Sequence, residues 1–225
     1  MKAIMIDLDG TLVESERAWL STFLKVYKEL SSLSGLDVNE IINIIRSYRF
    51  KLIRVSDPRA FDWDYILRTV SSKLGVRTDF YIEEEAPRIA QETKLVKGAI
   101  ETLKQLRQLG FKIIIGTNGN WKYQRYILNH HRLIDIVNEI RTSDMVGCLK
   151  NNPRFFKGID ISVGDHIVFD VHYPRIFGLK AILIGNFRKH LTTAKLLGID
   201  KLEKPSIAIR SIHELPRAIC SILGT

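Results

Sequence analysis

Cysteine is scarce in this sequence of 225 residues, which contains only Cys148 and Cys220. The two thiols form no ligand pattern with each other, and the six histidines show no metal-site spacing either. These absences argue against a disulfide framework and against a zinc site of the finger type. Isolated thiols are typical of a reducing compartment, so we predict a cytoplasmic protein.

Long apolar runs are missing as well. No run approaches the roughly 20 residues that a membrane helix requires, so we predict no membrane association. The first apolar stretch, at residues 3–6, is too short for a signal peptide and leads directly into two acids. Apolar residues nevertheless make up 45% of the chain, and charged residues make up 26% and are interspersed. Such a composition can fill a core and argues against global disorder.

Basic residues outnumber acidic ones, which gives a net charge of +9 and a pI near 9.6. A positive protein attracts anionic substrates, and the same charge would suit nucleic acid. The basic residues are spread along the chain, however, and no block of five or more occurs. We therefore expect a solvated basic surface and a small anionic substrate, and we do not expect a nucleic-acid groove.

Two kinds of pattern divide the chain. Residues 3–9 form a short apolar run that ends in carboxylates, which is typical of a buried parallel strand. Residues 15–91 have a helical spacing of apolar side chains, with a capping-box pattern at Asp37 and Glu40. From about residue 92 helical patterns alternate with apolar runs, which predict strands at residues 111–115, 136–140, 166–170, 180–184 and 206–209.

Alternating strands and helices predict an α/β protein with a Rossmann-like, doubly wound parallel sheet that is covered on both faces. The helical block separates the first strand from the others. We therefore predict a core built from residues 1–14 and 92–225, with an α-helical cap domain inserted at residues 15–91. Sites in such sheets lie beyond the carboxyl ends of the strands, and polar residues gather in the sequence at those points.

The run Asp-Leu-Asp-Gly-Thr-Leu at residues 7–12 has the strongest chemical character. Side chains at i and i+2 of a strand share a face, so Asp7 and Asp9 can point the same way. Two like charges held together require a cation or a shared proton. Gly10 lets the backbone leave the strand sharply and lie close to a ligand. One carboxylate can then attack phosphorus while the other moves a proton.

The same run resembles the first motif of the haloacid dehalogenase-like superfamily, whose members are mostly phosphatases. Further matches follow in the family's order. The apolar strand that ends in Thr117 and Asn118 resembles the second motif, and residues 94–98 resemble the segment that leads into it. Residues 147–156, which include Lys150, resemble the third motif, whose lysine binds the phosphoryl group. The helical block matches a helical cap of that family in placement and size.

The resemblance implies a Mg²⁺-dependent phosphatase that hydrolyses a small phosphorylated metabolite. Asp7 would be the nucleophile and would form an aspartyl-phosphate. Asp9 would protonate the leaving alcohol and then activate water. Thr117 and Lys150 would supply a hydroxyl and a cation to the phosphoryl oxygens, and Asn118 would position the nucleophile or its loop. Mg²⁺ would bind the Asp7 carboxylate, the backbone carbonyl of Asp9 and a downstream acid.

The downstream acid belongs to the fourth motif, for which two registers remain open. In one, residues 166–170 form a strand that ends in Asp170. In the other, Val-Gly-Asp ends the strand at Asp165 and Asp170 is a second acid, which places Pro174 in a helix that it disfavours. The β-branched pair Ile-Val at residues 167–168 suits a strand. We prefer Asp170 as the metal ligand and keep Asp165 as the reserve candidate.

Other functions compete with this interpretation. A dehalogenase of the same superfamily lacks the second acid of the first motif, so Asp9 argues against it. A sugar phosphomutase needs the same two acids and would isomerise its substrate with little release of phosphate. The unusual fourth motif also gives some weight to a non-catalytic binding protein on this fold. The sequence leaves the physiological substrate and the oligomeric state open.

Four cations lie in one helical segment of the cap, at Arg46, Arg49, Lys51 and Arg54. A solvated basic face is the simpler interpretation of such a group. The sharper hypothesis is that one of them contacts a second anionic group on the substrate.

Overall fold

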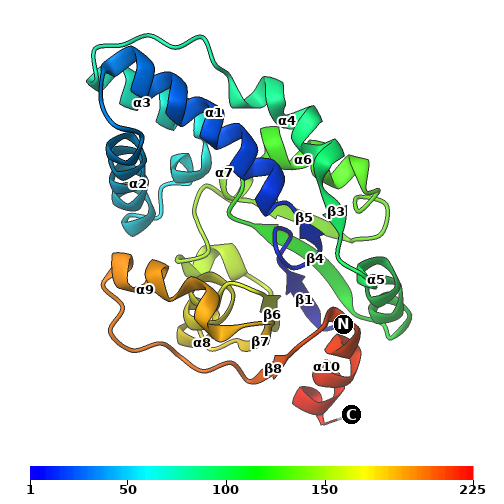
Figure 1. The fold of residues 1–225 in the computed structure, drawn as a ribbon. Helices are drawn as coiled ribbons and strands as arrows, with labels where there is room; N and C mark the ends of the chain where they lie inside the picture. The colour runs from blue at the N-terminus through cyan, green and yellow to red at the C-terminus, as the bar shows by residue number, and fades with distance from the viewer. Residues whose placement is uncertain (225) are drawn as a thin grey trace.

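A six-stranded parallel sheet forms the centre of the protein (Figure 1). The computed structural model describes residues 1–224, except for the side chains of residues 187 and 189. The strands lie in the order β5-β4-β1-β6-β7-β8. Their bounds are β1 Ala3–Ile6, β4 Lys112–Thr117, β5 Glu139–Thr142, β6 Ile161–Gly164, β7 Lys180–Ile184 and β8 Ile207–Ile209.

The strand order reverses at β1. After β1 the chain adds β4 and β5 on one side, and it then crosses over to add β6, β7 and β8 on the other side. In open parallel sheets a crevice forms beside such a reversal, outside the carboxyl ends of the strands. Asp7 directly follows β1, Thr117 ends β4, and Asp165 directly follows β6. The topology therefore brings these three residues to one crevice.

Both faces of the sheet are covered. One face packs against α5 (Ala99–Gln108), α6 (Trp121–His130) and α10 (Leu215–Leu223). The other face packs against the segments that follow β6 and β7, which include α8 (Tyr173–Ile176) and α9 (Leu191–Leu197). Strands buried on both faces must be apolar throughout, and β1 has four buried apolar residues in succession. The predicted doubly wound α/β fold is confirmed.

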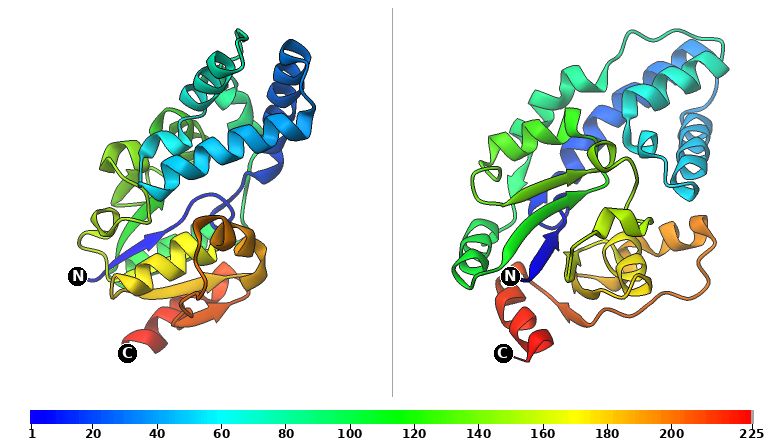
Figure 2. Two further views of the ribbon diagram at one scale, coloured as in Figure 1. Left: turned by 90° about the vertical axis from the view of Figure 1, so that its left-hand side faces the viewer. Right: turned by 180° about the vertical axis from the view of Figure 1, so that it is seen from behind.

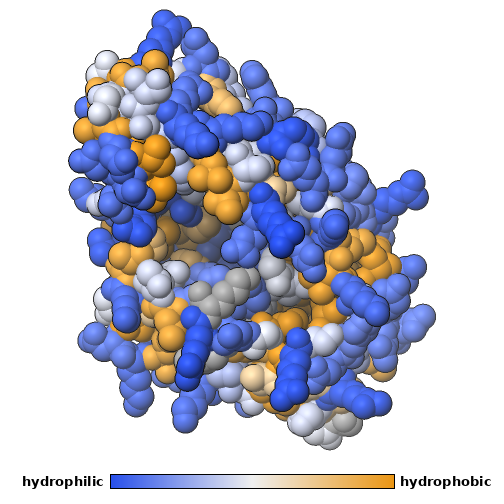
Figure 3. Space-filling model, viewed as in Figure 1, coloured by the Kyte–Doolittle hydropathy of each residue, from blue (hydrophilic) through white to orange (hydrophobic). Residues whose placement is uncertain are grey.

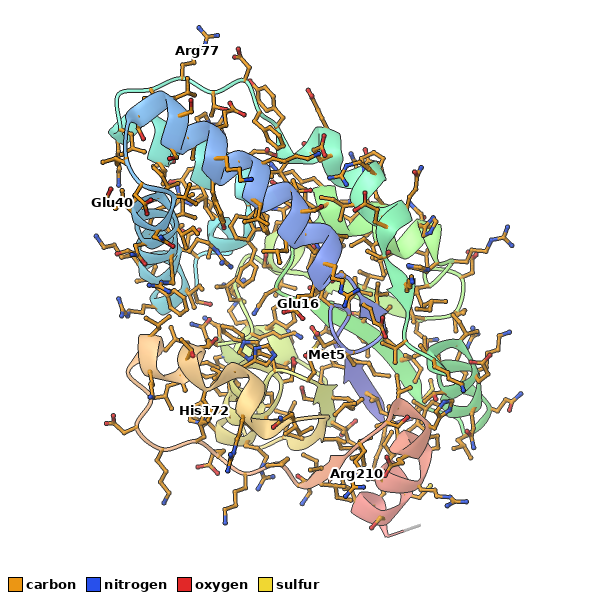
Figure 4. All side chains as sticks on the ribbon, in the orientation of Figure 1. Met5, Glu16, Glu40, Arg77, His172 and Arg210 are labelled. Carbon is orange, nitrogen blue, oxygen red and sulfur yellow. The ribbon has the colours of Figure 1, made fainter. Side chains whose placement is uncertain are left out.

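A block of four helices follows β1 in the chain and lies above the sheet in Figure 1. Asp37 and Glu40 form the predicted capping box at the start of its second helix. Figure 4 shows Arg77 at the outer tip of the block and Glu16 beside the loop that follows β1. The helices are α1 Glu16–Ser34, α2 Val38–Arg54, α3 Trp63–Lys73 and α4 Ile82–Glu92.

The chain enters this helical block and leaves it again at neighbouring points. The short strands β2 (Val13–Glu14) and β3 (Lys94–Leu95) pair in antiparallel fashion at the two crossing points. Figure 2 shows that the block stands over the end of the sheet at which the chain leaves β1. Its helices share an apolar core of their own, whose buried members include Val26, Leu30, Ile41, Ile45, Leu67, Val70 and Ile82.

The helical block also contacts the sheet-covering helix α6, through both apolar and polar groups. Tyr123 of α6 joins the core of the block, and its hydroxyl accepts a hydrogen bond from the backbone N–H of Asp64 (3.0 Å). Lys122 Nζ lies 2.7 Å from the Asp62 carboxylate and 3.0 Å from that of Asp64. These contacts hold the start of α3 against the core, close to the crevice.

The prediction of a strand at residues 166–170 is wrong. Residues Ile167–His172 form a helical turn with π-type hydrogen bonding, in which Tyr173 N donates to Val168 O. Pro174 then lies in the first turn of α8, where its missing N–H breaks no bond. The apolar run packs in a buried cluster with residues of β7, so burial rather than strand formation explains its composition.

The other strand predictions agree in position with small shifts. The run at residues 136–140 corresponds to β5, which begins and ends a few residues later. Among the described residues, no helix has both the length and the apolar character needed to cross a bilayer.

Candidate active site

The carboxylates of the first motif lie where β1 ends. The backbone N–H of Asp7 donates to Val163 O of β6 (2.9 Å), which continues the sheet pairing to the last residue before the turn. Gly10 has a φ of +81°, and a Cβ atom at this position would lie 2.6 Å from Asp165 Oδ2. Only glycine fits this close approach without strain. The turn thereby brings the first and fourth motifs into contact.

A buried lysine joins two of the acids. Lys150 Nζ donates to Asp7 Oδ1 (2.6 Å) and to Asp170 Oδ1 (2.7 Å), and its side chain is 2% exposed. Burial lowers the pKa of Lys150, but the neighbouring carboxylates of Asp170 and Asp7 outweigh burial and raise the pKa above its ordinary value. The ammonium group therefore stays charged and provides a permanent positive charge beside Asp7.

Three carboxylates form a cluster around this lysine. Asp7, Asp165 and Asp170 each offer one oxygen that lies within 4.8 Å of the other two. Burial raises the pKa of both Asp7 and Asp170, and repulsion from Asp165 adds to the rise. Carboxylate oxygens are the ligands that Mg²⁺ prefers, and a divalent cation would relieve the repulsion. The donor set therefore fits a hard divalent cation.

The helical turn after β6 directs Asp170 back toward β1. Asp170 Oδ2 accepts a hydrogen bond from His166 N (3.0 Å), and a Cβ atom at Gly164 would lie only 2.2 Å from the same oxygen. His166 Nδ1 accepts from Val168 N (3.3 Å), and burial lowers the pKa of His166 well below its ordinary value. Both acids that competed for the fourth motif, Asp165 and Asp170, thus reach the same cluster.

Asp9 lies beside the cluster in an environment of its own. Ser15 Oγ donates to Asp9 Oδ1, and Gln124 Nε2 donates to Asp9 Oδ2 (2.6 Å). Burial raises the pKa of Asp9, and these two hydrogen bonds offset the rise only in part. A carboxyl group with a raised pKa is suited to carry a proton at moderate pH. Asp9 can therefore transfer protons next to Asp7, which stays paired with Lys150.

The second motif contributes two polar side chains from the end of β4. Thr117 Oγ1 accepts a hydrogen bond from Gly119 N (2.9 Å), which leaves its own proton free to be donated to a ligand. Asn118 Oδ1 accepts from Lys150 N (2.8 Å), so the second motif fixes the backbone that carries the lysine. Both side chains line the same cavity as Asp7 and Lys150.

A cavity of about 450 Å³ lies over these residues. In Figure 3 the visible face is hollowed between the helices of the block and the lower part of the molecule. The floor carries the polar residues of the four motifs, including Asp7 and Lys150. The upper wall is largely aromatic and comes from the helical block, with Trp19, Phe23, Phe61 and Trp63. A ligand in the cavity would contact both parts of the molecule.

All the residues that the sequence nominated in the four motifs line this cavity: Asp7, Asp9, Thr117, Asn118, Lys150, Asp165 and Asp170. Sequence reasoning missed the two residues that bind the Asp9 carboxylate. Ser15 precedes a helix, where serine is a common cap, and this position could have drawn notice. No pattern marks Gln124, because its role depends on how α6 lies against the turn after β1.

Asp9→Asn is expected to raise the thermal stability of the metal-free protein at neutral pH. Burial raises the pKa of Asp9, so holding it ionised costs stability, and this cost grows as the pH rises through the folded-state value. An asparagine can still accept the hydrogen bond from Ser15. If the Gln124 amide turns, its buried Oε1, which has no partner among the described residues, can accept from the new amide. We expect a rise of roughly 2–4 °C, the shift that about 1 kcal/mol gives in a protein of this size.

Thermal melts in the presence of a chelator at pH 7.5 and near the ordinary aspartate value of 3.8 test this expectation. The rise should shrink toward the acidic end, because Asp9 is already protonated in the folded state and becomes protonated in the unfolded state as the pH falls through 3.8. Asp79→Asn, at an exposed site on the loop before α4, is the control and should change the melting temperature little. A lower melting temperature for Asp9→Asn than for the wild type at pH 7.5 would contradict the prediction.

Proteins of known family share this architecture. The family model of haloacid dehalogenase-like hydrolases matches residues 1–159. Glyceraldehyde 3-phosphate phosphatase from Pyrococcus furiosus is 24% identical over 209 residues, which cover 81% of this chain and 80% of that enzyme. The enzyme of the same name from Pyrococcus abyssi is 26% identical over 203 residues and covers similar shares of 81% and 80%.

Solved structures of other proteins have a similar fold. The crystal structure of a haloacid dehalogenase-type phosphatase from Thermococcus onnurineus matches with a TM-score of 0.74 and 26% identity, covering 97% of this chain and 98% of that one. L-2-haloacid dehalogenase from Xanthobacter autotrophicus shares the fold, with a TM-score of 0.65 and 16% identity over 97% of this chain and 98% of that one. With the family model spanning more than half of its residues, the chain belongs to the haloacid dehalogenase-like hydrolases.

Proposed function

We propose that this protein is a Mg²⁺-dependent phosphatase that hydrolyses a small phosphorylated metabolite through an aspartyl-phosphate on Asp7. The observation that carries the proposal is the position of Asp7, which lies at the strand reversal, 2.6 Å from the buried ammonium of Lys150 and within a cluster of three carboxylates. The positive charge of Lys150, together with a divalent cation held by the acids, would let a carboxylate approach a phosphate ester despite their like charges.

In the first half of the proposed reaction, an Asp7 oxygen attacks phosphorus in line with the ester bond. The bond from phosphorus to the ester oxygen breaks, and Asp9 donates its proton to the departing alkoxide. In the second half, Asp9 accepts a proton from a water molecule that attacks the same phosphorus. The bond to Asp7 breaks, inorganic phosphate leaves, and both carboxyl groups return to their starting states.

Three other side chains stabilise the transferring group in this proposal. The ammonium group of Lys150 stabilises the negative charge of the phosphoryl oxygens. Its hydrogen bonds to Asp7 and Asp170 hold it in position. Thr117 donates its hydroxyl proton to the same oxygens. Asn118 acts through Lys150, since it accepts a hydrogen bond from the backbone of that residue.

The Asp7, Asp165 and Asp170 carboxylates would hold Mg²⁺, together with the backbone carbonyl of Asp9. When bound, this ion would draw charge from the phosphoryl group and offset the repulsion between nucleophile and substrate. Placing Asp165 beside Asp170 as a ligand revises the expectation from the sequence, in which Asp165 was only the reserve.

We further propose that residues 15–91 act as a cap and that residues 1–14 and 92–225 form the catalytic core. Two paired strands support this division, because the chain passes from the core to the cap at Val13–Glu14 and returns to the core at Lys94–Leu95. A cavity of about 450 Å³ suits a small phosphorylated metabolite. The names of the two Pyrococcus relatives support a phosphorylated sugar of a few carbons.

Release of inorganic phosphate from 4-nitrophenyl phosphate by the purified protein tests the proposal directly. We expect turnover in the presence of Mg²⁺, with one molecule of 4-nitrophenol released for each molecule of phosphate. A phosphomutase would instead isomerise a sugar phosphate with little free phosphate, and a dehalogenase would release halide from a 2-haloacid. Either of these results without phosphate release would contradict the proposed function.

A further inference from the structure

One cap cation differs from its neighbours in where its side chain lies. Arg49 of α2 lines the cavity that contains Asp7 and Lys150. Arg46 is exposed and donates to Asn43 on its own helix (2.6 Å), and Arg54 donates to the backbone of Leu196 (2.7 Å). Lys51 is exposed as well and does not line the cavity, so only Arg49 of this basic group faces the site.

Aromatic rings and one backbone carbonyl hold the Arg49 side chain. Its guanidinium carbon lies 4.1 Å from the centre of the Trp63 ring and 5.1 Å from that of Phe61. Its Nε donates to Ala60 O (3.1 Å). These contacts occupy one donor and orient the plane of the group, which leaves the terminal N–H groups for a ligand.

Among the described residues, no carboxylate forms an ion pair with Arg49. Its neighbours there include Ala60, Phe61 and Trp63, and the Tyr27 hydroxyl lies close enough to interact with its charge. Burial lowers the pKa of Arg49 to about 10, which reflects the cost of a cation in this setting. An anion that enters the cavity would compensate this cost and would form charge-assisted, bidentate hydrogen bonds.

Lys150 and Arg49 line one cavity, Lys150 from the core and Arg49 from the helical block. Lys150 is committed to the acid cluster, where the proposed function places the reacting phosphate. The wall near Arg49 is largely aromatic, and the Arg49 guanidinium is a cation that the remainder of a substrate can reach. The cavity thus offers one anion-binding position for the reacting phosphate and another, provided by Arg49, for the rest of the molecule.

We propose that Arg49 binds a second anionic group of the substrate, a carboxylate or a second phosphate, and that the protein therefore selects phosphate esters with an anion at their far end. This inference rests on the proposed phosphatase function. It differs from what the names of the Pyrococcus relatives imply, since glyceraldehyde 3-phosphate ends in an uncharged aldehyde.

Two sets of matched substrates test whether Arg49 binds a carboxylate or a second phosphate. Glycerate 3-phosphate, glyceraldehyde 3-phosphate and glycerol 3-phosphate share one skeleton and differ in a single terminal group, which is a carboxylate in the first alone. Fructose 1,6-bisphosphate and fructose 6-phosphate differ by a second phosphate. We expect the wild-type protein to prefer the more anionic member of at least one set by about tenfold or more in kcat/KM.

Variants of Arg49 should remove this preference. Arg49→Gln is expected to lower the kcat/KM ratio between the anionic and the neutral member by about 10–100-fold. Arg49→Lys should give an intermediate ratio, because it keeps the charge but loses the planar fork. Arg46→Gln, on the same helix but exposed, should leave the ratio unchanged. A purely structural role for Arg49 would lower all substrates alike, and that result, or an unchanged ratio, would overturn the proposal.

A binding measurement keeps this inference separate from the proposed function. Trp63 lies next to the guanidinium, so its fluorescence should respond when an anion binds. Titration with glycerate 3-phosphate and with fructose 1,6-bisphosphate should give a Kd for at least one of them that rises about tenfold or more in Arg49→Gln but not in Arg46→Gln. If the protein bound in this way without turnover, the phosphatase proposal would fail and the anion site would stand. If both variants bound like the wild type, the anion site would fail.

Discussion

Asp7→Asn should reduce phosphate release by about four orders of magnitude or more in kcat, as the loss of an enzyme nucleophile typically does. A neutral amide is a poor nucleophile and cannot form the aspartyl-phosphate, and the other two acids of the cluster would be occupied in holding the metal. The substitution preserves the shape of the side chain. Because burial raises the pKa of Asp7, replacement by a neutral isostere should not lower the stability of the fold.

The intermediate itself gives the sharper readout. Acid quenching of the wild-type reaction should trap a phosphorylated protein that intact mass measurement detects, whereas Asp7→Asn should give none. Asp160→Asn is a suitable control, because Asp160 accepts a hydrogen bond from Ala3 N (2.7 Å) at the opposite end of β1 and asparagine can accept it too. The covalent mechanism would be untenable if Asp7→Asn kept substantial turnover or carried the phosphoryl group at another residue.

Removal of divalent cations is expected to have the second large effect, with activity falling by at least about a thousandfold and returning when Mg²⁺ is added. The reason lies in the charges of the site. Asp7, Asp165 and Asp170 lie close together, and Lys150 supplies one positive charge between Asp7 and Asp170. Without a further cation, repulsion among the acids opposes both their ionisation and the approach of an anionic substrate.

Asp170→Asn should weaken the binding of Mg²⁺ in a measurable way. The variant should need roughly 10–100-fold more Mg²⁺ for half-maximal activity, as is typical when a metal site is disturbed. Asp200→Asn, at an exposed acid after α9, is the matched control. Mg²⁺ should also raise the melting temperature of the wild-type protein more than that of Asp170→Asn. Full activity in a strong chelator would contradict the metal proposal.

These predictions share one physical cause. The site collects buried acids around a single lysine, so it costs stability that the rest of the fold must supply. The expected gain in melting temperature for Asp9→Asn tests the cost of the Asp9 carboxylate, and the expected stabilisation by Mg²⁺ tests the repulsion within the acid cluster. Both effects together would indicate that the ionised carboxylates, and not a loosely packed cavity, are the source of the cost.

The sequence pattern identified most of the fold because the relevant signals are local. The first strand, the capping box at Asp37 and the glycine at residue 10 each follow from short-range rules of periodicity, capping and steric fit. The first two motifs carried the family resemblance, and the family model matches residues 1–159. Beyond that range, local rules were less reliable.

The fourth motif shows where local reasoning failed. A buried β-branched run at residues 167–168 has the composition of a strand, yet it forms a helical turn. Burial on both sides favours the same apolar residues in a strand and in a helix, so composition alone cannot distinguish them. Pro174 argued against the helix, but a change from π-type to α-type hydrogen bonding places it in the first turn of α8.

By itself, the sequence determined the α/β class, the acids at the end of β1 and their resemblance to a hydrolase family, because neighbouring residues encode all three. Tertiary structure alone decided that Asp165 and Asp170 both reach Asp7, that Gln124 binds Asp9, and that Arg49 rather than its neighbours lines the cavity. These contacts join residues far apart in the chain. Their geometry depends on how strands, turns and helices pack, which no local pattern specifies.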